Sequence, residues 1–412
     1  MQKSVLIVAF YYPPYPKVGS RRWVKFAKYL NRHKTNIHVL AAQMDVDKKS
    51  PWDDDAKEIE HLTTRIHFKY WVPYYKRELP VSFFSKIKWQ ISKKLESDQK
   101  KALGNPSDGS ERYAPDFLSA IEKIIQDKKI TTIIFTASPN HLAYHISTLK
   151  EKYNNIKFIF DLRDYWSDWM KHLDVKALGY EEELERITIL NSDIIISPAK
   201  RILDTLKEKY PQKKHQMKLI SHAYDNDDFI NNTVNCDHKK NNDGIYLIYA
   251  GSMYENMEGN MKLLANLLLS NKNIYIKFYT FTEDYKSFFN HEAINKRVTY
   301  LKPLPIKEFT EKMNSEADAL IYMRSTLDND SNFLSSKFFD FLPSKKPIVY
   351  LGNKGDALDL IEKENLGFHL NTDTITNFKK LLSEAQEGIK RSDITKYSFD
   401  AVTHLLEAEI EN

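Results

Sequence analysis

Short apolar runs alternate with longer amphipathic stretches along most of this sequence. Strands that alternate with helices favour βαβ units, in which neighbouring strands run parallel. The first half is expected to contribute the strands Ser4–Phe10, Ile37–Ala42, Ile130–Thr136, Lys157–Phe160 and Asp193–Ser197, with helices that include His141–Tyr153 and Ala199–Tyr210. This pattern predicts an α/β fold built on parallel sheets.

A polar segment, Ser221–Asn242, divides the chain into two halves that show the same alternation. In the second half the expected strands are Tyr246–Ala250, Ile274–Tyr279, Ala319–Tyr322 and Ile348–Leu351, and the expected helices include Met261–Leu269 and Ser336–Leu342. We therefore expect two doubly wound domains, at residues 1–222 and 245–395, joined by a linker at 223–244. Mixed charged and aromatic clusters interrupt the pattern at about 45–115, which we interpret as an excursion from the first sheet.

Length and composition favour a folded protein without a membrane span. The chain has 412 residues, enough for more than one core, and no stretch approaches the ~18 apolar residues that a spanning helix needs. The first residues lack the basic start and the cleavage site of a secretory signal, and Cys236 is the single cysteine. These features predict a soluble or peripheral protein of the reducing cytoplasm.

Several predicted strands of the first half end in residues suited to ligand binding. In open α/β sheets, ligands bind outside the carboxyl ends of the strands. The first strand runs into the loop Tyr11–Ser20, which contains Gly19, and the strand that ends at Thr136 is followed closely by His141. A helix N-terminus favours a neutral imidazole at that position, and His145 is a weaker alternative. An ordinary tight turn and an exposed capping histidine are the plain interpretations of the same residues.

A short segment of the second half pairs a cation with a carboxylate. Ser335–Pro343 predicts a helix capped by its serines and ended by its proline. Lys337 and Asp340 are three residues apart and so share one helix face. This pair suits a ligand that carries phosphate at one end and ribose hydroxyls at the other, and a local surface ion pair is the alternative.

Several segments fit one known family, and they do so in the right order. They are Gly19-Ser20-Arg21-Arg22-Trp23, Phe160–Trp166, Gly251-Ser252-Met253, and Ser335–Pro343 with the Lys346-Pro347-Ile348-Val349 that follows. The chain thereby resembles the retaining glycosyltransferase family 4, and its Asp-Leu-Arg-Asp-x-Trp stretch resembles the signature of one subgroup. The resemblance implies the GT-B fold, a nucleotide sugar in the cleft between two domains, and a closing helix at 396–412 that completes the first domain.

The resemblance also implies roles for single residues. Asp340 stands where the family has the carboxylate that binds the nucleotide's ribose. Asn332, eight residues earlier, replaces a common glutamate, and the Arg and Lys often found beyond the glycine loop are missing here. The implied sets are His141, Lys337 and Arg324 for catalysis; Gly19, Gly251, Ser252, Ser336, Asn332 and Asp340 for the donor; and Arg21, Arg22, Arg163 and Asp164 for the acceptor side. Structural ordering is the alternative role for Arg163 and Asp164.

Basic residues gather in two stretches. The first loop and helix hold Lys17, Arg21, Arg22, Lys25, Lys28, Arg32 and Lys34. In the second stretch, Lys86, Lys88, Lys93 and Lys94 are interleaved with Phe83, Phe84 and Trp89. Charge combined with aromatic side chains suits contact with an anionic membrane, whereas a solvated helix face is the alternative. No nucleic-acid partner is expected, because zinc-finger spacing and RNA-binding motifs are absent.

Together these features predict a metal-independent, retaining glycosyltransferase. It would move a sugar from a nucleoside-diphosphate sugar to a glycan or lipid-linked glycan, in surface polysaccharide or lipopolysaccharide synthesis at the inner leaflet of the plasma membrane. No cofactor is expected, because no His, Cys, Asp or Glu set has metal-ligand spacing. A sugar-nucleotide epimerase of the same fold and a catalytically silent GT-B partner protein are the rival interpretations.

Overall fold

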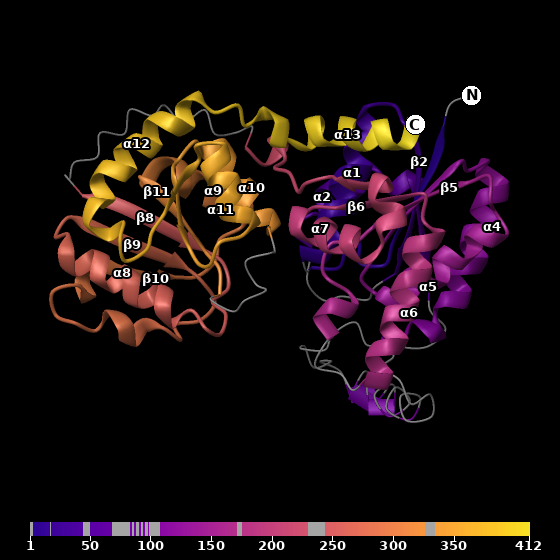
Figure 1. Ribbon diagram of the computed structural model, residues 1–412, viewed down its shortest axis with the longest axis horizontal. Coiled ribbons are helices and arrows are strands. Elements are labelled where there is room, and N and C mark those ends of the chain that lie inside the picture. Colours follow the sequence, from indigo (N-terminus) through magenta and orange to yellow (C-terminus); the bar gives the residue numbers. More distant parts are fainter. Residues whose placement is uncertain are drawn as a thin grey trace. The chain divides into compact units, whose positions relative to one another are not determined.

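The chain forms two compact units, each built on one parallel sheet (Figure 1). The computed structural model describes residues 3–16, 18–43, 50–67, 108–170, 175–229, 244–325 and 334–412, with scattered positions between 83 and 98. The first unit comprises Met1–Ile220 and Thr403–Asn412, and the second comprises Ser221–Val402. The predicted residues Lys17, Lys88, Trp89, Lys93, Cys236 and Asn332, and most of the ranges 45–115 and 223–244, lie outside the described residues.

The first unit has a seven-stranded sheet in the order β3-β2-β1-β4-β5-β6-β7. Its strands are β1 Ser4–Ala9, β2 Asn36–Ala42, β3 Thr63–Ile66, β4 Thr132–Thr136, β5 Lys157–Asp161, β6 Ile194–Ser197 and β7 Met217–Leu219. All neighbouring strands pair in parallel. The strand order reverses between β1 and β4, and such switch points are where open α/β sheets bind ligands.

Helices connect these strands. They are α1 Arg21–Arg32, α2 Asp53–Glu58, α4 Ala114–Lys128, α5 Asn140–Thr148, α6 Val175–Asn191 and α7 Lys200–Lys209, and the last helix is α13 Phe399–Glu411. Most of α13 belongs to the first unit, where it lies beside α1 (Figure 1).

The second unit repeats the plan with six parallel strands in the order β10-β9-β8-β11-β12-β13. The strands are β8 Ile245–Ala250, β9 Ile274–Tyr279, β10 Val298–Leu301, β11 Ala319–Met323, β12 Ile348–Leu351 and β13 Gly367–His369. The helices are α8 Glu258–Ser270, α9 Ile306–Glu316, α10 Ser336–Phe341, α11 Asp356–Lys363 and α12 Phe378–Arg391. Here the order reverses between β8 and β11.

Both faces of the second sheet are buried. Leu247 and Ile321 belong to one apolar cluster, and their neighbours Ile248 and Leu320 belong to another on the opposite face. Because side chains alternate along a strand, two separate clusters mean that helices cover both faces. The α/β fold with two doubly wound parallel sheets is therefore confirmed.

One edge strand differs from expectation. β3 lies inside residues 45–115, which we expected to leave the first sheet, yet it pairs in parallel with β2. Only Ile66 of this strand is buried. A short edge strand with one buried side chain carries little apolar periodicity, so the pattern did not reveal it.

The basic residues of α1 do not form an outward-facing surface. Lys25 and Lys28 are buried, and their Nζ atoms lie 2.8 and 2.7 Å from the two carboxylate oxygens of Asp55 in α2. Arg32 of α1 forms a pair of hydrogen bonds with the carboxylate of Glu58, which also belongs to α2. Lys25 and Lys28 therefore present no charge to an anionic membrane, because α2 supplies their partner charge within the unit, and membrane contact by this stretch stays a prediction.

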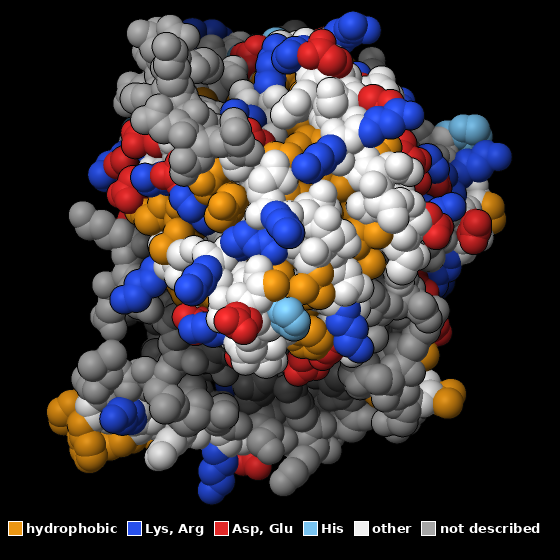
Figure 2. Space-filling view, turned by 90° about the vertical axis from the view of Figure 1, so that its left-hand side faces the viewer, with side chains coloured by type: hydrophobic (Ala, Val, Ile, Leu, Met, Phe, Trp, Pro, Cys, Tyr) orange, Lys and Arg blue, Asp and Glu red, His pale blue; other side chains and the backbone are white. Residues whose placement is uncertain are grey.

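Figure 2 shows a face of the second unit with mixed character. Lysines and arginines are interspersed there with acidic and apolar side chains. Such a mixture is typical of an ordinary solvated surface. None of the helices in the described part of the chain combines the length and the apolar character that crossing a membrane requires.

Candidate functional site

A buried aspartate ties the start of α1 to the end of β5. Asp161, the last residue of β5, accepts a hydrogen bond from Nε1 of Trp23 at 2.9 Å. Nε and Nη2 of Arg22 lie 3.2 Å from its two oxygens, and Nη2 also donates to the carbonyl of Ile220 at 2.8 Å. Arg22 is 2% exposed, so these internal partners occupy its charge. Arg21, the other arginine predicted for the acceptor side, is buried as well.

Arg163 joins two further loops. Its Nη1 donates to the carbonyl of Gly19 at 2.8 Å, and its Nε donates to the carbonyl of Ala137 at 3.1 Å. The loops after β1, β4 and β5 are thus fastened together at the switch point. Asp164, the next residue, is exposed. A side chain at Gly19 would meet only ordinary contacts within the chain, so any need for glycine there would come from a ligand.

His141 is held between two carboxylates. Its Nδ1 lies 3.1 Å from Oε1 of Glu111, and its Nε2 lies 2.8 Å from Oε1 of Glu181. Burial alone would lower the pKa of His141, but the hydrogen bonds to these two carboxylates outweigh it and raise the pKa to about 10. The expectation of a neutral imidazole is therefore wrong, because two carboxylates contribute more than one helix N-terminus. His145 is half-buried, and burial lowers its pKa.

Glu181 links His141 to the tryptophan of the Asp-Leu-Arg-Asp-x-Trp stretch. Its Oε2 accepts from Nε1 of Trp166 at 2.7 Å. The backbone N–H of His141 donates to Asp108 at 2.9 Å. Each ring nitrogen of His141 already has a partner, so the imidazolium serves as a fixed positive charge at the carboxyl end of β4.

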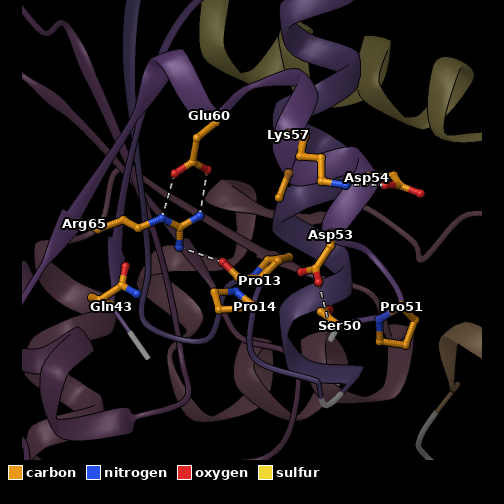
Figure 3. Close-up of a pocket in the computed structure, with 11 residues that line it drawn as sticks. Pro13, Pro14, Gln43, Ser50, Pro51, Asp53, Asp54, Lys57, Glu60 and Arg65 are labelled. Atoms are coloured by element: carbon orange, nitrogen blue, oxygen red, sulfur yellow. Dashed lines mark hydrogen bonds and ion pairs between the residues drawn. The ribbon is translucent and has the colours of Figure 1, made fainter. Parts of the chain in front are cut away.

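A cavity of about 570 Å³ lies beside the carboxyl ends of β1 and β2, and we call it the polar cavity because most of its lining residues are charged or polar. Figure 3 shows its lining, which comes from the loop after β1, the end of β2, α2 and β3. Arg65 forms a two-bond pair with Glu60 and donates from Nη1 to the carbonyl of Pro13 at 2.7 Å. Charged and amide side chains beside proline rings suit a hydroxyl-rich ligand.

In the second unit, the residues that directly follow three adjacent strands form one site. Gly251, Arg324 and Gly352 are the residues directly after β8, β11 and β12, which are neighbours in the sheet. Both glycines have positive φ, +144° and +145°, a region that other residues rarely adopt. A side chain at Gly352 would crowd Arg324, so the glycine allows this close approach. Asn260 of α8 donates to the carbonyl of Arg324 at 2.8 Å and holds the loop.

Lys337 of α10 reaches this edge. Its Nζ lies against Gly251, where any side chain would collide with it, and 4.9 and 5.9 Å from the ring centres of Tyr249 and Tyr322. Burial and then the charge of Arg324 lower the pKa of Lys337 to about 8, against the opposing effect of Asp340. Two cations thus converge on a glycine loop at a switch point, an arrangement suited to phosphate groups.

The helix that carries Lys337 is not capped as expected. No side-chain hydrogen bond caps α10; instead, the Ser335 hydroxyl lies 3.0 Å from the hydroxyl of Tyr322. Ser336 is buried, and Asp340 is half-buried one turn after Lys337. The second unit thus brings Gly251, Lys337, Arg324 and Asp340 into one region, while Ser252 is exposed beyond it.

Two sets of possible metal ligands occur among the described residues, both in the first unit. One consists of Asp108, Glu111 and His141, and the other of His33, His404 and Glu407; within each set the ligand atoms lie within 4.8 Å of one another. In each set two members lie three residues apart, but the third, His141 or His33, is distant in the sequence, so spacing along the chain did not indicate either set.

Sequence reasoning also missed partners of the predicted residues. Glu111 and Glu181 lie far from His141 in the chain, and no local signal marks them. Gly352 could have been found, because Tyr350-Leu351-Gly352-Asn353 repeats Tyr249-Ala250-Gly251-Ser252. In both stretches the tyrosine hydroxyl donates to the carbonyl three residues on, at 2.6 Å.

No protein-family model matches this sequence, and neither does any curated protein. Solved structures do match. A glycosyltransferase from Rickettsia africae ESF-5 shares 14% identity over 100% of this chain and 98% of its own, with a TM-score of 0.63. The lipopolysaccharide outer core galactosyltransferase WaaB, apo form, shares 11% over 99% of each chain, with a TM-score of 0.59.

An enzyme of another class has the same fold. The UDP-GlcNAc 2-epimerase from Neisseria meningitidis, bound to UDP-GlcNAc, shares 11% identity over 99% of this chain and 100% of its own, with a TM-score of 0.56. At these identities the likeness shows the fold alone. The chain has the GT-B fold, which glycosyltransferases and these epimerases share.

Removing the Asp161 carboxylate should destabilise the first unit. Asp161→Ala leaves the buried Arg22 charge without its carboxylate, which costs about 3–5 kcal/mol. Urea unfolding would measure the loss. Asp164→Ala is the matched control, because Asp164 is exposed and should change stability by less than about 0.5 kcal/mol. Equal effects of the two variants would contradict a structural role for the Asp161 network.

The two carboxylates around His141 predict a pH-dependent stability. The folded pKa of about 10 lies above the ordinary value of 6.5, so the stabilisation is complete below pH 6.5 and is lost as pH rises through 10. His141→Gln should therefore cost about 2–4 kcal/mol at pH 6 and much less at pH 9.5. Denaturant titrations at both pH values, with His145→Gln as control, would measure this. A cost independent of pH would show that His141 is not held as an imidazolium.

Proposed function

We propose that this protein is a glycosyltransferase that uses a nucleoside-diphosphate sugar. The observation that carries the proposal is that Lys337 lies against Gly251, and close enough to Arg324 to feel its charge, at the switch point of the second sheet. A diphosphate needs positive charge and closely approaching backbone, and this edge offers both. The Rickettsia glycosyltransferase and WaaB, which share the fold, support the class of reaction.

Asp340 completes the proposed donor site. It lies one turn after Lys337 on α10, so a ligand whose phosphates meet Lys337 would present its ribose hydroxyls to the Asp340 carboxylate. We assign the diphosphate to Gly251, Lys337 and Arg324, and the ribose to Asp340. The resemblance to family 4 implied the same role for Asp340 and also placed Gly251 at the donor.

The proposed chemistry keeps the configuration of the transferred sugar. The bond between the anomeric carbon and the β-phosphate oxygen breaks, and the acceptor oxygen attacks from the same face. Its proton passes to the departing phosphate, on which negative charge develops. Lys337 and Arg324 would stabilise that charge, so the step needs no metal ion in this proposal.

A second candidate is a sugar-nucleotide epimerase. Asp108, Glu111 and Glu181 gather at the end of β4, and paired carboxylates could act as acid and base there. However, Glu111 and Glu181 each have one carboxylate oxygen in contact with His141. These contacts favour a role in positioning His141 over a role as catalytic acid or base. If the protein is an epimerase, it will exchange deuterium from solvent into a nucleotide sugar without any acceptor, whereas a transferase will not.

For the acceptor side, we propose the polar cavity of the first unit (Figure 3). It lies at the carboxyl ends of β1 and β2, where the loops of a parallel sheet meet ligands. A glycan offers the hydroxyls that its amide and charged lining can bind. The exposed residues Phe83, Phe84, Ile87 and Ile91 suggest that the acceptor is carried on a lipid, because apolar side chains at this spacing suit a membrane surface.

Replacing Lys337 should separate stability from function. Lys337→Met removes a charge that the fold disfavours, so the free energy of unfolding at pH 7 should rise by about 1–3 kcal/mol, while sugar transfer should fall at least a hundredfold. In the parent enzyme kcat/KM should fall above pH about 8, as Lys337 loses its proton. Calorimetric titration with nucleoside diphosphates and a transfer assay would measure binding and turnover.

Lys363→Met is the matched control for this prediction. Lys363 lies on α11 of the same unit, and its side chain is 78% exposed. Its replacement should change neither the free energy of unfolding nor the rate of sugar transfer. If Lys337→Met leaves diphosphate affinity and transfer intact, the donor site lies elsewhere.

The membrane contact has its own test. Phe83→Ser combined with Phe84→Ser should reduce co-sedimentation with phosphatidylglycerol vesicles at least tenfold, because both rings are more than 70% exposed. Phe281→Ser, which alters an equally exposed ring of the second unit, is the control. Activity on a short water-soluble acceptor should persist. If vesicle binding survives the double substitution, Phe83 and Phe84 do not anchor the protein to the membrane.

A further inference from the structure

Two histidines from opposite ends of the chain share one carboxylate oxygen. Nδ1 of His33, the residue that follows α1, lies 3.0 Å from Oε2 of Glu407. Nδ1 of His404 lies 2.9 Å from the same oxygen. The two imidazole rings are stacked, with centres 4.2 Å apart and planes 13° apart. All three side chains belong to the first unit.

The carboxylate is oriented by a neighbour. The hydroxyl of Thr35 donates to Oε1 of Glu407 at 2.6 Å, which turns Oε2 toward the histidines. Hydrogen bonds of this kind orient the ligands of metal sites. The cluster is therefore a fixed arrangement of two ring nitrogens and one oxygen.

The spacing of these three atoms is close to that of a metal site. Tetrahedral coordination with bonds of ~2.0–2.1 Å places neighbouring ligand atoms about 3.3 Å apart. The two nitrogen–oxygen distances, 3.0 and 2.9 Å, are slightly shorter, and all three atoms lie within 4.8 Å of one another. A small outward movement of each side chain would make room for an ion.

The cluster is accessible from solvent. The side chain of His404 is 64% exposed, while those of His33 and Glu407 are 13% and 17% exposed. An ion could enter beside His404 and keep a water molecule as its fourth ligand. His404 and Glu407 lie three residues apart on α13, so the helix itself presents them together.

From this geometry we propose that His33, His404 and Glu407 bind a divalent transition-metal ion, represented by Zn²⁺. Two imidazoles and one carboxylate match the ligands that Zn²⁺ prefers, whereas Mg²⁺ and Ca²⁺ require oxygen ligands. One carboxylate charge offsets part of the charge of the ion. To bind the ion through Nδ1, each imidazole would have to carry its ring proton on Nε2.

The ion would join the end of α1 to α13. Without it, His33 is joined to α13 by its hydrogen bond with Glu407, whereas the hydrogen bond between His404 and Glu407 lies within α13. With it, three coordinate bonds would fix the last helix on the first unit. The site is structural in this proposal, and it is separate from the glycine loop and the polar cavity described above.

The test is calorimetric titration of the full, EDTA-treated and dialysed chain with ZnCl₂ at pH 7.5. We expect one site with a dissociation constant of about 1 μM or below, and a rise in Tm on saturation. His404→Ala and Glu407→Gln should each weaken Zn²⁺ binding at least tenfold and abolish the rise in Tm. MgCl₂ should have no effect on the parent protein.

His215→Ala is the matched control, because His215 is an exposed histidine of the same unit and should leave binding unchanged. His404 is largely exposed, and alanine favours helices, so His404→Ala should fold. Parent protein that binds no Zn²⁺ would overturn the proposal. Undiminished binding in His404→Ala and Glu407→Gln would overturn it as well, and would direct attention to Asp108, Glu111 and His141.

Discussion

The first unit depends on one buried ion pair, Asp161 with Arg22. A carboxylate without exposed surface at the end of a central strand is unfavourable unless it is paired and hydrogen-bonded, and Arg22 and Trp23 meet that need. Because both partners belong to the first turn of α1, the pair fixes where α1 begins and so where the loop before it ends. Arg163 then fastens the loops after β1 and β4 to β5. The Asp-Leu-Arg-Asp-x-Trp stretch is thereby a structural junction, extended through Trp166 and Glu181 to His141.

In the second unit, Lys337 lies half-buried close to Arg324, and burial together with that neighbour lowers its pKa to about 8. Its Nζ lies against Gly251, a position where a side chain would collide with it. Because its charged form is disfavoured there, Lys337 gains from an anion that binds beside it. This is the physical reason for assigning the donor diphosphate to the second unit.

The sequence predicted the fold well where strands are buried and apolar. β1, β4 and β12 were found within one or two residues, whereas β3 and β7, short and near sheet edges, were not. For the site, Gly251 was identified from its position after a strand and Lys337 from its place beside Asp340 on a predicted helix, and the structure brings Gly251 and Lys337 together. The setting of His141 could not be predicted, because Glu111 and Glu181 approach it only through the fold. The burial of Lys25 and Lys28 in α1 could not be predicted for the same reason, because their partner Asp55 approaches them only through the fold.

The most direct test of the central claim is a crystal structure of the chain with a bound nucleoside diphosphate. The account predicts the β-phosphate within hydrogen-bonding distance of Nζ of Lys337 and beside the backbone of Gly251, with the ribose hydroxyls facing Asp340. A diphosphate bound in the polar cavity of the first unit, or anywhere away from the ends of β8 and β11, would contradict it.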